Sequence, residues 1–248
     1  RYLPKSLDEV NLTCDYVSRY TGGRRALINY ADLASVVGTW HSPRYYAVNR
    51  AGLTAAIQKQ WQAFGAIMVF NWHMDQPYTT NGFPQASYRF KSGGLNKNVI
   101  RQILDGSGDP CGTDLIEGKP LRKPAANPRA WFLDQLADVA EFFNGLKDPE
   151  TGDSIPVILR YPHEADGDWF WWGNGWCSAE EFRAFCRFEA DFLRRACGPD
   201  RILFAYTPDR QWKEFGREGD TANTFLARYP GDAYTDIIGI DDYSIGNG

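Results

Sequence analysis

Ile155–Tyr161 (IPVILRY) runs directly into Pro162-His163-Glu164, and this stretch carries the strongest indication of the fold. A short, continuous apolar run fits a strand that is buried on both faces, as in a parallel sheet covered by helices. Ala66–His73 (AIMVFNWH) has the same form, an apolar run that ends in polar and aromatic residues. Because the carboxyl ends of parallel strands meet at one edge of a sheet, these two strand ends predict a functional site there.

Further strands and several helices are predicted around these two runs. The strands are expected at 25–30, 44–48, 201–206 and 236–240, and the helices at 32–38, 52–64, 128–144 and 178–197, with a weaker one at 95–104. Asn127 is a good N-cap in front of Pro128, and Ser178 with Glu181 forms a capping box. The alternation of strand and helix predicts the α/β class, and Cys186 on the apolar side of the last helix is expected in the core.

The distribution of polar residues narrows this class to a (β/α)8 TIM barrel. They gather just after the strands, where such a barrel places its active site, and no glycine-rich nucleotide fingerprint is present. The 248 residues suit one barrel domain over 1–248, yet only six strands are predicted. We therefore expect the six N-terminal βα units of a single catalytic barrel, truncated after strand six. The connection 74–127 is predicted to be a substrate-binding loop.

Composition excludes several classes of function. The 27 Lys and Arg against 31 Asp and Glu give a net charge of −4, which disfavours a nucleic-acid binder. The longest clean apolar run, Ala66–Phe70, is far too short for a membrane span. No C-x-x-C spacing occurs and the three His do not cluster with Cys, so no structural zinc site is expected. No cofactor is predicted. The 9 Trp, 13 Tyr and 15 Phe favour a large aromatic core, or a site where sugars stack.

The chemistry is expected in Arg160–Gly173 (RYPHEADGDWFWWG). A carboxylate at a strand end, beside His163 and before four aromatic residues, suits glycoside hydrolysis. The general acid must have a raised pKa, which burial beside indoles provides, and a second carboxylate must act across the sugar ring. The alternative is a strand end whose aromatic residues simply pack under a loop. Asp166 and Asp168 are expected to project into that loop without a catalytic role.

This segment resembles glycoside hydrolase family 26, the β-mannanase family, whose pattern is R-P-x-H-E-x-x-G-x-W-F-W-W-G. Two further matches follow the family's order: Asn71-Trp72-His73 with Pro77, and Tyr229–Tyr243 (YPGDAYTDIIGIDDY). The resemblance covers about residues 26–243. It implies a retaining endo-β-1,4-mannanase that needs no metal and acts by double displacement.

The resemblance also implies roles for single residues. Glu164 is expected to be the general acid/base, His163 to help hold the site, and His73 to contact the sugar in the −1 subsite. The other expected substrate-binding residues are Trp169, Asp241, Tyr243, Trp72 and Trp172, the last with a core role as an equal alternative. The family's nucleophile, a Glu at the end of strand seven, has no match in this sequence. We therefore expect a longer chain; a protein that ended at Gly248 would be inactive and poorly soluble.

The expected substrates are β-mannan, glucomannan, galactomannan and manno-oligosaccharides. The resemblance also admits a lichenase, a β-1,3-xylanase or a non-catalytic glycan-binding relative, and it leaves endo or exo action open. The chain starts at Arg1 without Met or an apolar leader, as a processed export product or a trimmed chain would. We expect a monomer that is exported to the extracellular space, the periplasm or the cell surface, with no nucleic-acid partner.

Overall fold

A computed structural model of the chain describes residues 19–24, 27–37, 43–74, 76–78, 98–112, 115–116, 119–120, 124–209 and 225–242. Its centre is one sheet of five parallel strands in the order β1-β2-β5-β6-β7. These are β1 (Ile28–Asp32), β2 (Ile67–Asn71), β5 (Val157–Arg160), β6 (Ile202–Tyr206) and β7 (Ile237–Ile238). All carboxyl ends therefore point to one edge of the sheet. Every helix within the described ranges is too short or too polar to span a bilayer.

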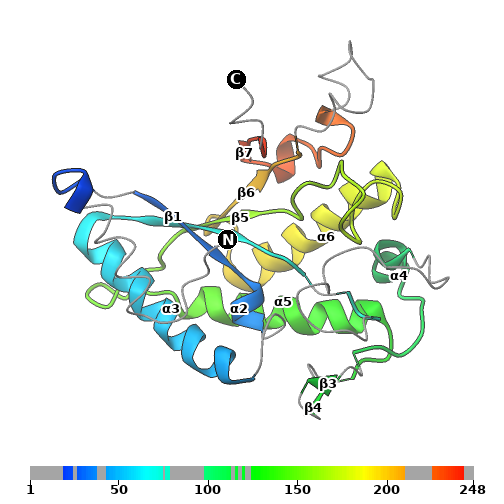
Figure 1. Cartoon of the computed structure of the whole chain (residues 1–248), viewed down its shortest axis with the longest axis horizontal. Helices are drawn as coiled ribbons and strands as arrows, with labels where there is room; N and C mark the ends of the chain where they lie inside the picture. The colour runs from blue at the N-terminus through cyan, green and yellow to red at the C-terminus, as the bar shows by residue number, and fades with distance from the viewer. Residues whose placement is uncertain are drawn as a thin grey trace.

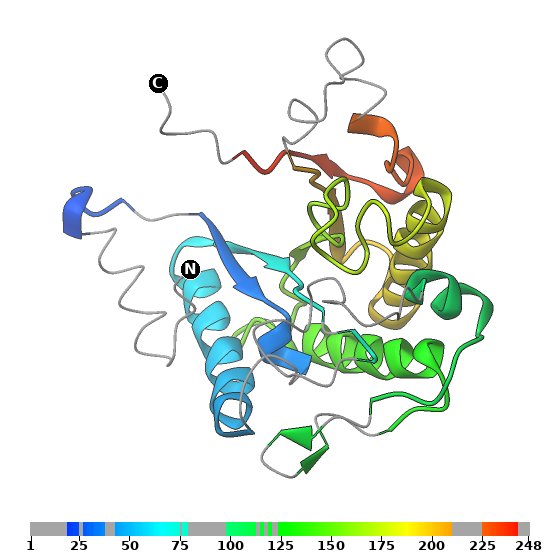
Figure 2. The same ribbon diagram turned by 45° about the vertical axis from the view of Figure 1, so that its right-hand side comes forward.

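The helices between these strands confirm the predicted α/β class. They are α2 (Ala34–Val37), α3 (Pro43–Phe64), α4 (Val99–Asp105), α5 (Pro128–Gly145) and α6 (Ala179–Cys197). Helices α3, α5 and α6 lie along one side of the sheet (Figures 1 and 2). A short antiparallel pair, β3 (Leu115–Ile116) with β4 (Lys119–Pro120), and a 3-10 helix, η2 (Asp232–Tyr234), complete the described elements.

The helices predicted at 128–144 and 178–197 are confirmed as α5 and α6. Their starts could be predicted because the capping side chains make specific hydrogen bonds there. The side chain of Asn127 accepts a hydrogen bond from the backbone N–H of Ala130 at the start of α5. The capping box of Ser178 and Glu181 opens α6, which carries acidic residues in its first turn and basic residues in its last.

The strand predicted at 44–48 is wrong. These residues belong to α3, which begins at Pro43 and continues without a break into the helix expected from 52 onward. Proline is favoured in the first turn of a helix, because its fixed φ suits the helix and its missing N–H needs no partner there. That start signal outweighs the short β-like composition of the five residues, and one predicted strand is lost.

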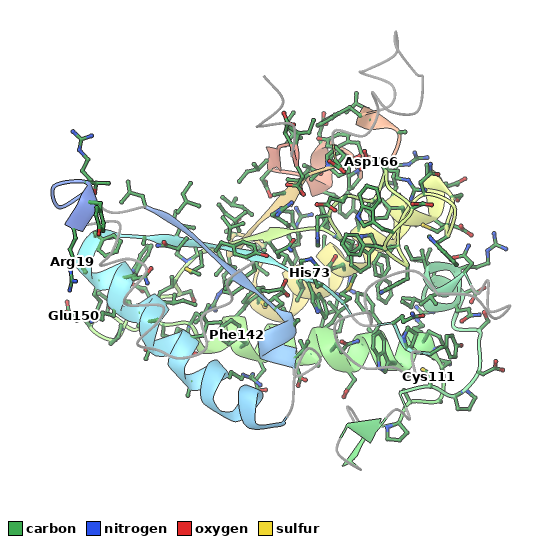
Figure 3. The ribbon with its side chains drawn as sticks, in the orientation of Figure 1. Arg19, His73, Cys111, Phe142, Glu150 and Asp166 are labelled. Atoms are coloured by element: carbon green, nitrogen blue, oxygen red, sulfur yellow. The ribbon has the colours of Figure 1, made fainter. Side chains whose placement is uncertain are left out.

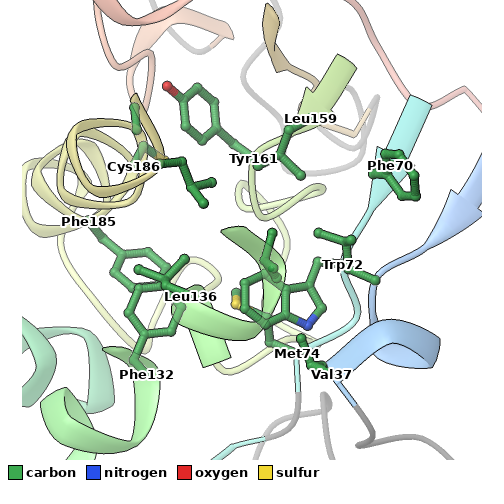
Figure 4. Close-up of a cluster of buried hydrophobic side chains, with 14 of the residues drawn as sticks. Val37, Phe70, Trp72, Met74, Phe132, Leu136, Leu159, Tyr161, Phe185 and Cys186 are labelled. Atoms are coloured by element: carbon green, nitrogen blue, oxygen red, sulfur yellow. The ribbon is translucent and has the colours of Figure 1, made fainter. Parts of the chain in front are cut away.

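Strand registers divide the sheet side chains between two faces. Phe70, Leu159 and Phe204 share the face that packs against the helices, and all three are buried. Together with α5 and α6 side chains such as Phe132 and Phe185 they form the hydrophobic core. Figure 4 shows Phe70, Leu159, Phe132 and Phe185 in this core. Cys186 lies fully buried in this core, as predicted.

The opposite face of the sheet is largely uncovered. Ile28 and Tyr30 of β1 and Leu203 of β6 are 63%, 52% and 43% exposed. Among the described residues, no further strand pairs with the outer edge of β1 or of β7. The described strands thus form an open arc of the α/β-barrel type, with exposed apolar side chains on its inner face.

Candidate active site

The carboxyl ends of the parallel strands bring together side chains that are far apart in the sequence. Asp32 is the last residue of β1, His73 follows β2 by two residues, and Glu164 follows β5 by four. The side chain of His73 lies near the middle of the molecule (Figure 3), and His73, His163 and Glu164 are all buried. The structure therefore collects the three residues around which the sequence analysis placed the chemistry.

His73 and His163 form a buried pair of rings. Their Nε2 atoms lie 3.2 Å apart, within hydrogen-bonding distance, and the ring centroids are 4.5 Å apart in an edge-to-face arrangement. The ring of Phe170 contacts both imidazoles edge-on, at 5.7 Å and 5.0 Å between centroids. This packing leaves the two imidazoles little rotational freedom.

Glu164 is held in a strained and well-defined position. It is the one residue other than glycine with a positive φ in the described part of the chain, at 53°. Its backbone N–H donates to the carbonyl of Thr207 after β6, and its Oε2 accepts a 2.8 Å hydrogen bond from the indole Nε1 of Trp169. Strained backbone of this kind persists only where surrounding contacts enforce it, and it is common in active sites.

A second polar group lies beside this cluster, at the ends of β5 and β7. The guanidinium Nη2 of Arg160 contacts both carboxylate oxygens of Asp241, at 2.8 Å and 2.6 Å, and also the hydroxyl of Thr207 at 2.7 Å. The backbone of Asp241 is in turn bridged to that of Asp209. Asp241 therefore lies at the edge of the site, where its carboxylate is paired with Arg160.

Asp166 was expected to project into the loop, but its carboxyl group is mostly buried and interacts electrostatically with Glu164. Its Oδ1 accepts a hydrogen bond from the backbone N–H of Asp209. Burial, with a smaller contribution from the nearby charge of Glu164, raises the pKa of Asp166 to about 6 against the opposing backbone hydrogen bond from Asp209. A second titratable carboxyl group thus lies within electrostatic reach of Glu164.

Comparison with known proteins identifies the family at this point. The sequence model of the family described as "Glycosyl hydrolase family 26" matches residues 23–247. The chain belongs to glycosyl hydrolase family 26. The resemblance seen in the sequence motifs is confirmed.

Two curated relatives of the chain are named as mannanases. A mannan endo-1,4-beta-mannosidase of Bifidobacterium adolescentis is 39% identical over 92 residues, which is 37% of this chain and 9% of that protein. One from Bacillus subtilis strain 168 is 26% identical over 181 residues, 67% of this chain and 41% of that protein. The chain thus spans less than half the length of these curated relatives.

Solved structures of family 26 share the fold. The β-mannanase BoMan26A of Bacteroides ovatus superposes with a TM-score of 0.64 at 29% identity, over 88% of this chain and 53% of that one. GH26C of Muricauda sp. MAR_2010_75 gives a TM-score of 0.70 at 24% identity, over 92% and 53%. The chain covers about half of each, and its parallel sheet and helices are those of the family's α/β barrel.

Two aromatic residues expected to bind substrate in this family 26 chain are part of its core. Trp72 is 2% exposed and stacks on Phe132 of α5 (Figure 4), and Trp172 is 0% exposed. Neither ring offers a face to a sugar, so that prediction is corrected in favour of the core role. Trp172 acts through its neighbours: its Nε1 donates to the carbonyl of His163, and its ring stacks on Phe170.

Trp169 differs from these two because it remains partly exposed beside Glu164. Of the four consecutive aromatic residues in the family motif, Trp169 is the one whose ring is partly exposed and could contact a ligand beside Glu164. Tyr243, the remaining predicted binding residue, lies outside the described residues. No group of three or more His, Cys, Asp or Glu side chains converges on a possible metal position within the described ranges.

Sequence reasoning missed Asp32, which contacts His73 directly. The predicted first strand ended at residue 30, and Asp32 was assigned to the following helix. A strand extended by two residues would have placed Asp32 at the carboxyl edge, beside the other polar strand ends. The alternation in Ile28–Asp32 is the signal that could have found it.

Proposed function

We propose that this family 26 protein is a retaining endo-β-1,4-mannanase in which Glu164 is the general acid/base. Three observations support it: the mannanase relatives, the buried cluster of Glu164, His163 and His73 at the carboxyl edge of the sheet, and the partly exposed Trp169. The hydrogen bond from Trp169 to Glu164 is the single observation that carries the assignment, because it fixes the direction of the buried carboxyl group beside a partly exposed indole.

The proposed chemistry follows from this geometry. In the first step Glu164 gives its proton to the glycosidic oxygen as the bond to the leaving sugar breaks. In the second step the same carboxylate accepts a proton from the water that releases the enzyme-bound sugar. The indole N–H of Trp169 on Oε2 fixes the direction of the carboxyl group through both steps. His73 and Trp169 are proposed to contact the sugars on either side of the bond.

Retention also needs a nucleophilic carboxylate about 5–5.5 Å from the acid. The described carboxylates near Glu164 already have other partners: Asp32 contacts His73, Asp241 contacts Arg160, and Asp166 accepts from the backbone of Asp209. We therefore assign the nucleophile to none of them. This keeps the expectation, drawn from the family resemblance, that it is a glutamate following a further strand.

The proposed substrate bears on the location of the protein. Mannan is a polymer too large to cross a bilayer, so an endo-acting mannanase must meet it outside the cytoplasm. We accordingly propose that the protein is exported and acts as a monomer on β-mannan or manno-oligosaccharides.

The test is a product profile of the full-length protein on unbranched mannan, with Glu164→Gln as the variant. The amide keeps the shape of the side chain but has no proton to give, and general acid catalysis contributes roughly 10²–10⁴-fold. We expect kcat on mannan to fall by that factor, with binding of manno-oligosaccharides retained. An aryl mannoside with a good leaving group should lose less in its first step, since it needs less protonation.

Glu150→Gln, in an exposed turn between α5 and β5, is the matched control and should keep full activity. Barley β-glucan and β-1,3-xylan are assayed in parallel. Turnover of either in preference to mannan would contradict the proposal that mannan is the substrate. Binding of mannan without any turnover would contradict the proposal that the protein is an enzyme. Normal mannan hydrolysis by Glu164→Gln would contradict the assignment of Glu164 as the general acid.

A further inference from the structure

The carboxylate of Asp32 is built into the end of β1 by three contacts. Its Oδ1 accepts hydrogen bonds from the backbone N–H groups of Ala34, at 2.9 Å, and of His73, at 3.2 Å. Its Oδ2 lies 2.5 Å from the ring Nδ1 of His73. Both side chains are buried, so water does not weaken this contact.

These contacts define which ring nitrogen of His73 carries a proton. A carboxylate is an acceptor only, so Nδ1 must donate to Asp32. The amide Nδ2 of Asn71 also lies 3.3 Å from Nδ1, but it is a donor and would require a bare nitrogen. The shorter, charge-assisted contact with Asp32 is the stronger of the two, and it places the proton on Nδ1.

The state of His73 in turn determines its hydrogen bond to His163. One proton lies between the two Nε2 atoms. Which ring carries it depends on whether the Nδ1 of that ring is protonated, because a neutral imidazole has only one N–H. A neutral His73 with Nδ1–H presents a bare Nε2 and accepts from His163, whereas the opposite tautomer would donate. Asp32 therefore selects the direction of this hydrogen bond from the far side of the ring.

We propose that Asp32 is a positioning residue of the site: it holds His73 in the Nδ1–H form and thereby sets the orientation of the His73–His163 pair next to Glu164. The consequence for turnover rests on the proposed function, in which His73 contacts the sugar. Asp32 acts through His73, whose backbone N–H and ring Nδ1 it contacts.

The decisive variant is Asp32→Asn in the full-length protein. The two backbone N–H groups hold the single remaining oxygen of the amide, so its NH₂ faces Nδ1 of His73 and demands an acceptor there. The ring must then change to the Nε2–H tautomer. An aspartate-to-asparagine change that enforces the wrong histidine tautomer is known to be severe in serine proteases.

Side-chain ¹⁵N NMR of histidine-labelled protein reads the tautomer directly. The 248 residues contain three His, and a His73→Gln variant identifies the resonances of His73. We expect a protonated Nδ1 in the wild type and a bare Nδ1 in Asp32→Asn. A wild-type His73 with a bare Nδ1, or one unaffected by the substitution, would overturn the proposal. The wild-type spectrum alone decides this even if the variant does not fold.

Asp148→Asn is the matched control, because Asp148 makes the same kinds of contact at the opposite end of the sheet. Its Oδ1 accepts from the backbone N–H of Glu150, and its Oδ2 accepts from the indole N–H of Trp61. We expect Asp32→Asn to lower kcat on mannan by roughly 10²-fold, the cost of a misplaced contact, while Asp148→Asn keeps kcat. Equal losses in both variants would show a merely structural role. A wild type without mannanase activity would refute the proposed function, while the tautomer would still test Asp32.

Discussion

At the scale of single residues, Gly167 explains how the loop after Glu164 brings an indole back onto the carboxyl group. A Cβ at this position would lie 2.1 Å from Cη2 and 2.3 Å from Cζ3 of Trp169. The backbone N–H of Gly167 also donates to the carbonyl of Glu164, closing a turn. The turn and the missing side chain together let Trp169 lie close enough to donate to Oε2.

Gly167→Ala should therefore damage the site without unfolding the protein. The methyl group cannot coexist with the observed ring position, so Trp169 must move and its hydrogen bond to Glu164 must be lost. We expect kcat on mannan to fall by roughly 10²-fold, with a change in tryptophan fluorescence. Gly145→Ala is the control, because a Cβ there meets nothing within 4 Å. Full activity in Gly167→Ala would show that the contact has no catalytic consequence.

The positions of the site residues could be predicted from the sequence, but the roles of the neighbouring tryptophans could not. Glu164, His163 and His73 could be placed at one edge because each follows a predicted parallel strand. The roles of Trp72, Trp169 and Trp172 could not be separated, since neighbouring positions on a strand or loop point in different directions. Only the packed structure shows that Trp72 and Trp172 are buried while Trp169 remains partly exposed.

At the scale of elements, helix ends were predicted well where a side chain performs a specific task. The caps Asn127 and Ser178 mark α5 and α6 correctly, because each satisfies a backbone N–H that has no other partner. The segment 44–48 has no such signal within it, and its β-like composition gave a wrong strand. Tertiary context and the proline at 43 decide that region instead.

Helix α6 also organises the segment that leads into β7. Arg187 donates to the carbonyl of Pro230, and Arg194 donates to the carbonyl of Ala233, while both guanidinium groups lie over the ring of Tyr234. The conspicuous sequence Tyr229-Pro-Gly-Asp232 is thus anchored by arginines on one helix. This explains structurally why a motif far from Glu164 contributes to the position of Asp241.

Glu181 links the start of α6 to α4. Its carboxylate accepts from the backbone N–H of Ser178 at 2.8 Å, from Nδ2 of Asn98 at 2.8 Å and from Nε of Arg101 at 2.6 Å. Burial by itself would raise the pKa of Glu181, but these three hydrogen bonds outweigh it and lower the pKa to about 2. One side chain therefore both caps α6 and ties α4 to it.

Glu181→Ala should lower the free energy of unfolding by about 2 kcal/mol at pH 7, because it removes a cap and a charged hydrogen-bond acceptor. The exposed Arg101 contributes little of this. The folded pKa lies below the ordinary value near 4.5, so this stabilisation is complete above pH 4.5 and is lost as the pH falls toward 2. Denaturant unfolding across that range measures it. Glu181→Gln, which keeps an acceptor, should lose less, and equal losses in both variants would contradict the account.

At the scale of the whole molecule, the sheet is covered on one face and open on the other. The helix-facing side chains could be predicted from apolar runs, which mark burial without showing what covers it. The exposure of Ile28, Tyr30 and Leu203 on the inner face depends on barrel closure, a property of the entire sheet. The chain also spans about half the length of its solved relatives. The packing that stabilises the described chain therefore lies mainly in the half of the sheet that the helices cover.

Glu189 is the most unusual member of that covered half. It lies on α6, is 1% exposed, and its Oε2 has no hydrogen-bond partner among the residues that the structure describes. Tyr161 and Cys186 are the titratable groups close enough to feel its charge. Burial raises the pKa of Glu189 to about 8, so the folded protein keeps this carboxyl group protonated at neutral pH.

The raised pKa of Glu189 should make the stability of the folded protein depend on pH. Between about pH 4.5 and pH 8 the folded state holds a proton that the unfolded state has released, so the stabilising effect is complete below pH 4.5 and is lost as the pH rises to about 8. The slope should be about 1.4 kcal/mol per pH unit. Glu189→Gln cannot ionise, so its free energy of unfolding should exceed that of the wild type by a margin that grows with pH and levels off above pH 8. Denaturant unfolding at several pH values measures this margin, with Glu180→Gln on the exposed side of α6 as the control. A margin that stays constant from pH 5 to pH 8 would mean that Glu189 is ionised in the folded core and must have found a partner there.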